Sequence, residues 1–201
     1  GHVITEEDIP VLLSVGKDNV YIWEKGETRL HENEAAEILR EMCQGEYMHP
    51  TPVKEGKIEL VADIDGLLKV DSDKMKKING MGELMIASRH GNFAVKKGDK
   101  LAGTRIIPLV IEREKMEQAK AVCEGEPILE LKPFVHKKVG IVTTGNEVYY
   151  HRIEDTFTPV IKEKLAEYDT EVIGQEICND DHEKITKAIL SFIERGADLV
   201  L

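Results

Sequence analysis

The sequence predicts an α/β protein in which a three-layer parallel sheet of βαβαβ order follows a smaller, mixed, strand-rich α+β region. From residue 137 onward, apolar strand patterns alternate with amphipathic helix patterns, which is typical of a right-handed parallel sheet covered by helices. Before residue 134, short β-type runs are separated by turn residues. We therefore expect a small α+β segment over 1–45, a strand-rich α+β domain over 46–134 and a partial α/β domain over 135–201.

The composition is that of an ordinary globular protein with an acidic balance. Of its 201 residues, 41% are hydrophobic and 32% are charged, and the formal net charge is −11. This charge argues against nucleic-acid binding, which needs clustered Lys and Arg, and against docking on an anionic membrane. It leaves room for a small anionic ligand, because local backbone amides can bind one.

Cysteine usage and hydropathy favour a cytoplasmic protein. Cys43, Cys123 and Cys178 lie far apart without a CxxC pair, so we expect free thiols. No apolar stretch is long enough to span a bilayer, and no signal peptide is visible. The chain begins with Gly1 and stops within the strand-like run 197–201, and we therefore expect a fragment of a longer protein.

The first 134 residues contain short helix and strand patterns. Helices are expected up to residue 15, with Thr5 or Asp8 as the N-cap, and over 32–43, 71–79 and 113–123. The apolar face of the second helix comprises Ala35, Ala36, Leu39, Met42 and Cys43. Strands are expected over 19–24, 58–64, 67–70, 84–87, 93–95, 101–111 and 127–131, with 97–99 as a hairpin-type turn.

The last third has the clearest pattern. Strands are expected over 139–143, 171–177 and 198–201, and the first is a continuous apolar run, as in a strand covered on both faces. Asp180 and Glu183 form an approximate capping box for the second of two helices. The apolar faces of the two helices are Phe157, Val160, Ile161, Leu165 and Tyr168, and then Ile185, Ala188, Ile189, Phe192 and Ile193.

Polar residues gather where the first two strands of this unit end. In an open parallel sheet, ligands bind beyond the carboxyl ends of the strands. Gly145 permits close backbone approach, and Thr144 and Asn146 can hydrogen-bond a polar ring or a phosphate. Glu147 and Asp180 are carboxylates that could hold Mg²⁺ beside a phosphate, while capping a helix is the alternative role for Asp180.

These motifs resemble the molybdopterin-binding domain of molybdenum-cofactor biosynthesis proteins. The similarity rests on the strand end Thr144-Gly145-Asn146-Glu147, on Asp155 at the start of the first helix, and on Asp180-Asp181 after the second strand. Asn146 stands where the family more commonly has Asp, which removes one carboxylate. The resemblance implies a partial molybdopterin-binding fold, truncated after its third strand.

The nearest relatives by this resemblance are the molybdopterin molybdotransferases, which insert molybdate into adenylylated molybdopterin with Mg²⁺. The resemblance implies molybdopterin as the ligand, Mg²⁺ as the metal and a homo-oligomer. Glu147 and Asp180 would be the catalytic and metal-binding acids of such a transferase. The residues in contact with the cofactor would be Thr144, Gly145, Asn146 and Asp155.

Other functions stay open. A nucleotide pyrophosphatase of the competence-damage type shares this fold and a similar Gly-Asp-Glu strand end, although that family begins with the domain, which here follows residues 1–134. A non-catalytic pterin-binding module would carry the same motifs, and whether the protein is an enzyme is left open. Upstream, Arg89, His90 and Arg105 could reach an anionic ligand, with turn and surface roles as the alternative.

Overall fold

The computed structural model describes residues 4–20 and 26–201 of the chain. Near the N-terminus lie a 3-10 helix, η1 (Glu6–Asp8), and helix α1 (Ile9–Ser14). The predicted cap is confirmed: the backbone N–H and the hydroxyl of Thr5 donate to the Asp8 carboxylate at 2.8 and 2.9 Å. The strand predicted over 19–24 lies largely outside the described residues.

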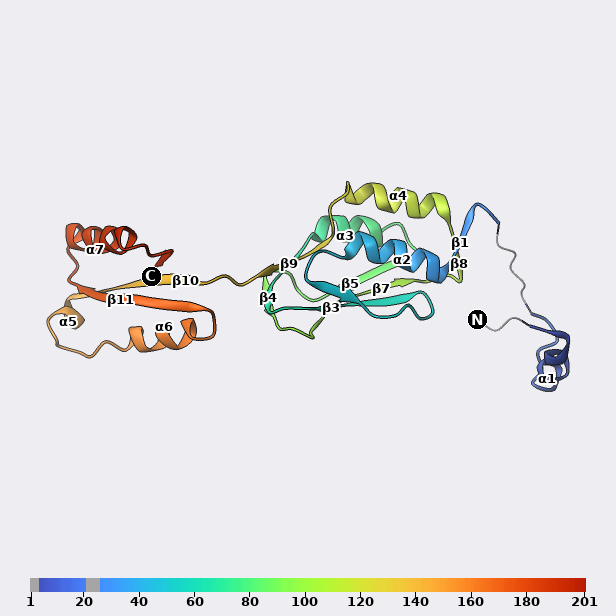
Figure 1. Cartoon of the computed structure of the whole chain (residues 1–201), viewed down its shortest axis with the longest axis horizontal. Helices are drawn as coiled ribbons and strands as arrows, with labels where there is room; N and C mark the ends of the chain where they lie inside the picture. The colour runs from blue at the N-terminus through green and yellow to red at the C-terminus, as the bar shows by residue number, and fades with distance from the viewer. Residues whose placement is uncertain (1–3, 21–25) are drawn as a thin grey trace.

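A central unit follows, which Figure 1 shows in the middle of an elongated molecule. Its order of elements alternates short strands with three amphipathic helices. The elements are β1 (Arg29–His31), α2 (Glu32–Cys43), β2 (Met48–Pro50), β3 (Lys57–Ala62), β4 (Gly66–Val70), α3 (Ser72–Asn79), β5 (Leu84–Ser88), β6 (Phe93–Val95), β7 (Lys100–Ile106), β8 (Val110–Glu112), α4 (Arg113–Cys123) and β9 (Leu129–Pro133).

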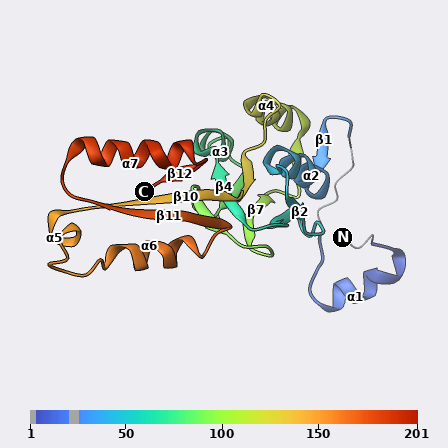
Figure 2. The same cartoon turned by 60° about the vertical axis from the view of Figure 1, so that its left-hand side comes forward.

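The central unit is built on antiparallel sheets. One has the order β2-β3-β7-β5, another has the order β6-β4-β9, and β1 pairs with β8. Figures 1 and 2 show α2, α3 and α4 gathered on one side of the four-stranded sheet. Buried and more exposed residues alternate along β3, so the opposite face of this sheet is open to solvent.

The core of the central unit extends from Leu30 to Leu131 and so continues across residue 45. All five residues of the predicted apolar face of α2 are buried in it, which confirms that face. Cys43 and Cys123 are buried free thiols in the same core, and burial raises the pKa of Cys43 to about 12. A thiol with so high a pKa stays protonated and inert at neutral pH.

Two strand predictions in the central unit are wrong. The run 101–111 is divided into β7 and β8, because Pro108 lies between them and has no N–H for a ladder. The turn 97–99 does not join a hairpin, since β6 pairs with β4 whereas β7 pairs with β3 and β5. Instead the Gly98 N–H and the Asp99 carbonyl bond to Ala62, which leads the chain from one sheet to the other.

The C-terminal unit confirms the predicted parallel sheet. Its strands β10 (Lys137–Thr144), β11 (Thr170–Cys178) and β12 (Leu199–Val200) lie parallel in the order β11-β10-β12. Its helices are α5 (Asn146–Tyr149), α6 (Phe157–Leu165) and α7 (His182–Glu194). In both Figure 1 and Figure 2, α7 lies over one face of the sheet and α6 over the other, which gives three layers.

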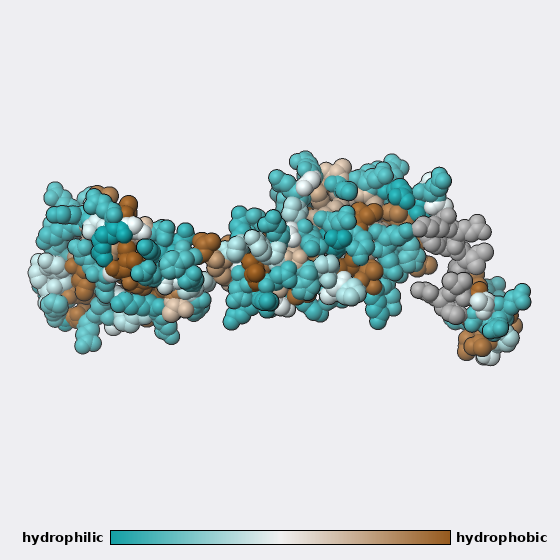
Figure 3. Space-filling model, in the orientation of Figure 1, coloured by the Kyte–Doolittle hydropathy of each residue, from teal (hydrophilic) through white to brown (hydrophobic). Residues whose placement is uncertain are grey.

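The predicted burial of the helix faces in this unit is only partly correct. On α7, Ala188 and Phe192 are buried, but on α6 the buried residue is Thr158, while Phe157 is 72% exposed. The sheet is narrow, because β12 pairs with β10 through only two residues, so it covers part of each helix. Hydrophobic residues therefore show on the surface of this unit in Figure 3. None of the described helices is long and apolar enough to cross a membrane.

Candidate functional site

The end of β10 is shaped by Gly145. Its φ of +135° is rarely adopted by L side chains, and a Cβ added there would lie 3.0 Å from Glu147 Oε1. The Gly145 N–H donates to the Cys178 carbonyl at 3.2 Å, which joins the end of β10 to the end of β11. The turn thus places Thr144 and the exposed Glu147 carboxylate at the carboxyl edge of the sheet.

Two predicted site residues from separate loops meet at this edge. Asn146, at the start of α5, donates from Nδ2 to Asp180 Oδ2 at 2.6 Å. The capping role considered for Asp180 is wrong, because Asp181 is the N-cap of α7 and accepts from the Glu183 and Lys184 N–H groups. Asp180 is therefore held by Asn146 rather than by the helix that follows it.

Asn179, which precedes this pair, has an unusual environment. Its Oδ1 atom is buried and has no hydrogen-bond partner among the described residues. A buried acceptor left unpaired costs about 1–3 kcal/mol, so such an atom calls for an explanation. Asn179 lies directly after the end of β11 and next to Asp180.

Asp155 lies in a dense hydrogen-bond network. Its Oδ1 accepts from the Phe157 and Thr158 N–H groups at 3.0 and 3.1 Å, and its Oδ2 accepts from the Thr158 hydroxyl at 2.5 Å and from Gln175 Nε2 at 2.7 Å. The Thr158 hydroxyl is the main cause that holds the Asp155 pKa below its usual range, while burial opposes the shift. The carboxylate thus caps the first turn of α6 and ties that helix to β11.

Sequence reasoning missed the partners of Asp155. Gln175 on β11 also donates to the Thr158 hydroxyl at 2.8 Å, and Thr143 on β10 lies 3.0 Å from that hydroxyl. The available signal was a polar residue, Thr143 or Gln175, inside each of these two strands. Such residues need partners when a helix packs over them.

Hollows lie on both sides of the strand ends. On the α6 side, a cavity of about 360 Å³ is lined by His151, Arg152, Asp155 and Ile177 among others. On the α7 side, a second cavity of about 360 Å³ is lined by residues that include Tyr149, Lys184, Lys187 and Ser191. The two lysines on α7 were not identified from sequence, and they place positive charge near the site.

The donor set at this edge is small for a metal ion. Glu147 and Asp180 offer carboxylates and Asn146 offers an amide oxygen. Within residues 4–20 and 26–201, no group of three or more His, Cys, Asp or Glu is placed to share a metal. The residues present therefore do not form a dedicated Mg²⁺ cage.

The upstream polar residues are separated by the fold. Arg89 pairs with both oxygens of Asp99 at 3.1 Å, and His90 bonds to the Gly91 carbonyl. Both therefore have local structural partners. Arg105 on β7 instead lines a cavity on the open face of the four-stranded sheet.

Comparison with known families finds a match for the C-terminal unit. Residues 140–201 match the family described as a probable molybdopterin binding domain, which confirms the resemblance for this part of the chain. Residues 1–24 match a family described as a domain of unknown function (DUF8806). No curated protein matches the chain.

One solved structure is similar to the chain. It is the molybdopterin biosynthesis moeA protein from Pyrococcus horikoshii OT3, with 13% identity, a TM-score of 0.27 and coverage of 85% of this chain. This chain spans 65% of the length of that protein.

Proposed function

We propose that the C-terminal unit binds molybdopterin at the carboxyl edge of its sheet, in a step of molybdenum-cofactor biosynthesis. The family match over 140–201 gives the class of ligand. The observation that carries the location is the 2.6 Å hydrogen bond between Asn146 and Asp180, which unites the two loops where the motifs lie. Ligands of open parallel sheets bind at this edge.

The chemistry of the edge suits a pterin. A pterin ring presents N–H donors on one side, and the Asp180 carboxylate and the unpaired Asn179 Oδ1 are acceptors. Gly145, without a side chain, allows a flat ring to approach the backbone. Lys184 and Lys187 on the α7 side provide positive charge for a phosphate group.

Molybdate insertion is the finer proposal. In it Glu147 and Asp180 act as the acids, and Thr144 and Asn146 position the ligand. Mg²⁺ would have to complete its coordination with water and ligand phosphate oxygens, because the described residues supply no cage. When bound, the ion would neutralise phosphate charge. A cytoplasmic location and a homo-oligomer belong to the same proposal.

Anaerobic calorimetric titration of the 201-residue chain with molybdopterin tests binding. We expect Asp180→Ala to weaken binding about tenfold or more, since a hydrogen bond to a charged group contributes about 1.5–3 kcal/mol. The matched control is Asp169→Ala, which removes an exposed carboxylate from the same unit, where Asp169 pairs with His136. Equal affinities of wild type and Asp180→Ala, or an equal loss in the control, would contradict the proposed location.

A further inference from the structure

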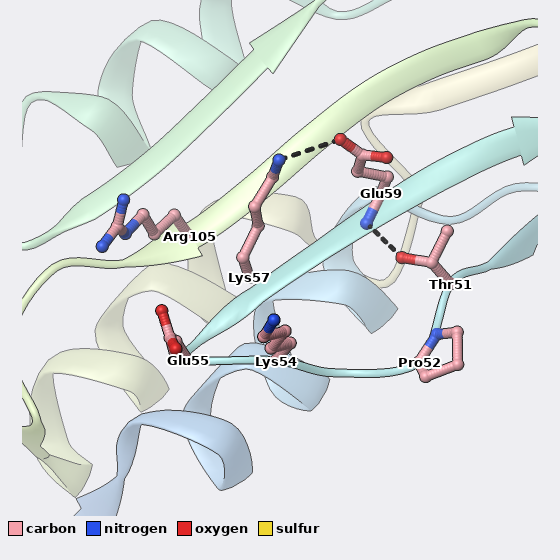
Figure 4. Close-up of a pocket in the computed structure, with 7 residues that line it drawn as sticks. All are labelled: Thr51, Pro52, Lys54, Glu55, Lys57, Glu59 and Arg105. Carbon is pink, nitrogen blue, oxygen red and sulfur yellow. Dashed lines mark hydrogen bonds and ion pairs between the residues drawn. The ribbon is translucent and has the colours of Figure 1, made fainter.

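The open face of the four-stranded sheet has a polar hollow of about 340 Å³ that is remote in sequence from the pterin site (Figure 4). It is formed by β3, by the neighbouring strand β7 and by the segment that leads into β3. The polar residues that line it are Thr51, Lys54, Glu55, Lys57, Glu59 and Arg105.

Two cations stand opposite each other in this hollow. Lys57 on β3 is the register partner of Arg105 on β7, and Figure 4 shows their side chains on the same face of the sheet. Like charges directly opposite on neighbouring strands are destabilising. An anion between them would turn this repulsion into attraction.

The nearby carboxylate of Glu59 is already neutralised. It accepts from Lys57 Nζ at 2.9 Å and pairs with Lys100 Nζ at 2.7 Å. These two lysines lower the pKa of Glu59 to about 2, so the group stays ionised and engaged at neutral pH. Arg105 therefore gains no compensation from it.

Two cations of the hollow have no partner among the described residues. Neither Arg105 nor Lys54 forms an ion pair or a side-chain hydrogen bond within this part of the chain. The chain carries a net charge of −11, so acidic residues outnumber basic ones overall. The lining holds three cations against the two carboxylates of Glu55 and Glu59, and Glu59 is also engaged by Lys100, so the hollow keeps an excess of positive charge.

The hollow is preformed. A two-residue turn with φ of +50° at Glu55 and +68° at Gly56 joins Lys54 to Lys57. The turn is fixed by hydrogen bonds from the Gly56 N–H to Asn33 Oδ1 at 3.0 Å and from the Ile106 N–H to the Gly56 carbonyl at 2.9 Å. The two lysines are thus held at its ends.

The face of β7 beside Arg105 is also open at Gly103. Gly103 on β7 is the register partner of Glu59 on β3. A Cβ added at Gly103 would meet nothing within 4 Å. A ligand can therefore rest on the backbone of β7 without displacing a side chain.

We propose that Lys54, Lys57 and Arg105 bind a phosphate-type oxyanion on the open face of the central unit. The planar guanidinium of Arg105 matches two oxygens of a phosphate, and the two ammonium groups act as point charges. The anion is either free phosphate or the phosphate group of a small molecule. This site is independent of the pterin site, because it uses none of the same residues.

Titration of the full chain with inorganic phosphate and with glycerol 3-phosphate, at constant ionic strength, tests the proposal by calorimetry and thermal unfolding. Both probes should raise the melting temperature of the wild type, and Arg105→Gln should weaken binding at least tenfold. Without phosphate, Arg105→Gln should be as stable as the wild type or more stable, because it removes a like-charge pair. If glycerol 3-phosphate binds more tightly than inorganic phosphate, the natural ligand is the phosphate group of a small molecule. If inorganic phosphate binds equally well or more tightly, the natural ligand is free phosphate.

Arg29→Gln is the matched control, since Arg29 is an exposed arginine of the same unit that pairs with Glu112 at 2.8 Å. The proposal is overturned if neither probe binds the wild type at millimolar concentration. It is also overturned if the control loses as much affinity as Arg105→Gln, or if Arg105→Gln lowers the melting temperature without phosphate. Asp180→Ala should leave phosphate affinity unchanged, so this outcome is separable from that of the pterin proposal.

Discussion

Three aspartates near the strand ends of the C-terminal unit have three different roles. Asp155 uses both carboxylate oxygens to hold the start of α6, and Asp181 caps α7. Asp180 is held by Asn146 at the edge of the sheet. Asp155 and Asp181 thus reach backbone N–H groups at helix starts, whereas Asp180 is the one that we propose faces the ligand.

Asp155→Ala should destabilise the chain by about 1 kcal/mol at pH 7, the typical cost of removing a side chain that accepts from the N–H groups of a first helical turn. The folded-state pKa of Asp155 is lowered, so its contribution is complete above the unfolded pKa of about 3.9 and is lost as pH falls through the folded value. Chemical unfolding of wild type and variant between pH 7 and pH 2 measures this. The gap should be constant down to about pH 4 and then shrink, and a gap that grows in acid would refute this role.

At the residue scale, the sequence indicated where the polar cluster lies. It did not indicate which residue of the cluster has which role. Asn146 and Asp180 are separated by 34 positions, and only the parallel pairing of β10 with β11 brings them together. The N-cap of α7 is Asp181 and not the predicted Asp180, because capping depends on the backbone conformation at the helix start. The unpaired Asn179 acceptor has no signature in sequence at all.

At the scale of elements, two glycines allow α7 to pack closely on the sheet. Gly140 on β10 and Gly174 on β11 are register partners, and both lie under the ring of Phe192. A Cβ added at Gly140 would stand 2.4 Å from Phe192 Cγ. The close approach of α7 to the sheet therefore depends on the missing side chains.

Gly140→Ala should destabilise the C-terminal unit by about 1–3 kcal/mol, since the added methyl group overpacks a filled core. Thermal or urea unfolding measures the change, and the double variant with Phe192→Leu should recover part of it. Gly103→Ala is the control, because an added Cβ at that strand position meets nothing within 4 Å. A Gly140→Ala protein as stable as the wild type would show that the ring has room to move.

Elements with strong periodicity were predicted well. The helices α2 and α4 and the strand β6 have the bounds expected from sequence. Pairing was predicted poorly in the central unit, since a turn such as 97–99 can equally close a hairpin or lead from one sheet to another. The strands β1 and β2 were not predicted, because each has a single buried residue, Leu30 or Met48, and so no apolar run.

At the scale of the whole molecule, the described residues bury hydrophobic side chains in both units. The core between Leu30 and Leu131 belongs to the central unit, and Val139, Ile141 and Phe192 are among the residues buried in the C-terminal unit. We propose a ligand site in each unit: the strand ends in the parallel sheet, and the cationic hollow on the antiparallel one. The alternation of strands and helices predicted the parallel sheet, whereas the hollow depends on a cross-strand register that sequence does not reveal.

Amide shift mapping of the ¹⁵N-labelled chain during anaerobic titration with molybdopterin tests the proposed site. The largest changes should fall at Gly145, Asn146 and Glu147 and at Asn179 and Asp180, because these residues form the carboxyl edge of the sheet. The amides of the central unit should change little. Largest changes in the central unit, or none at the ends of β10 and β11, would contradict a pterin site at this edge.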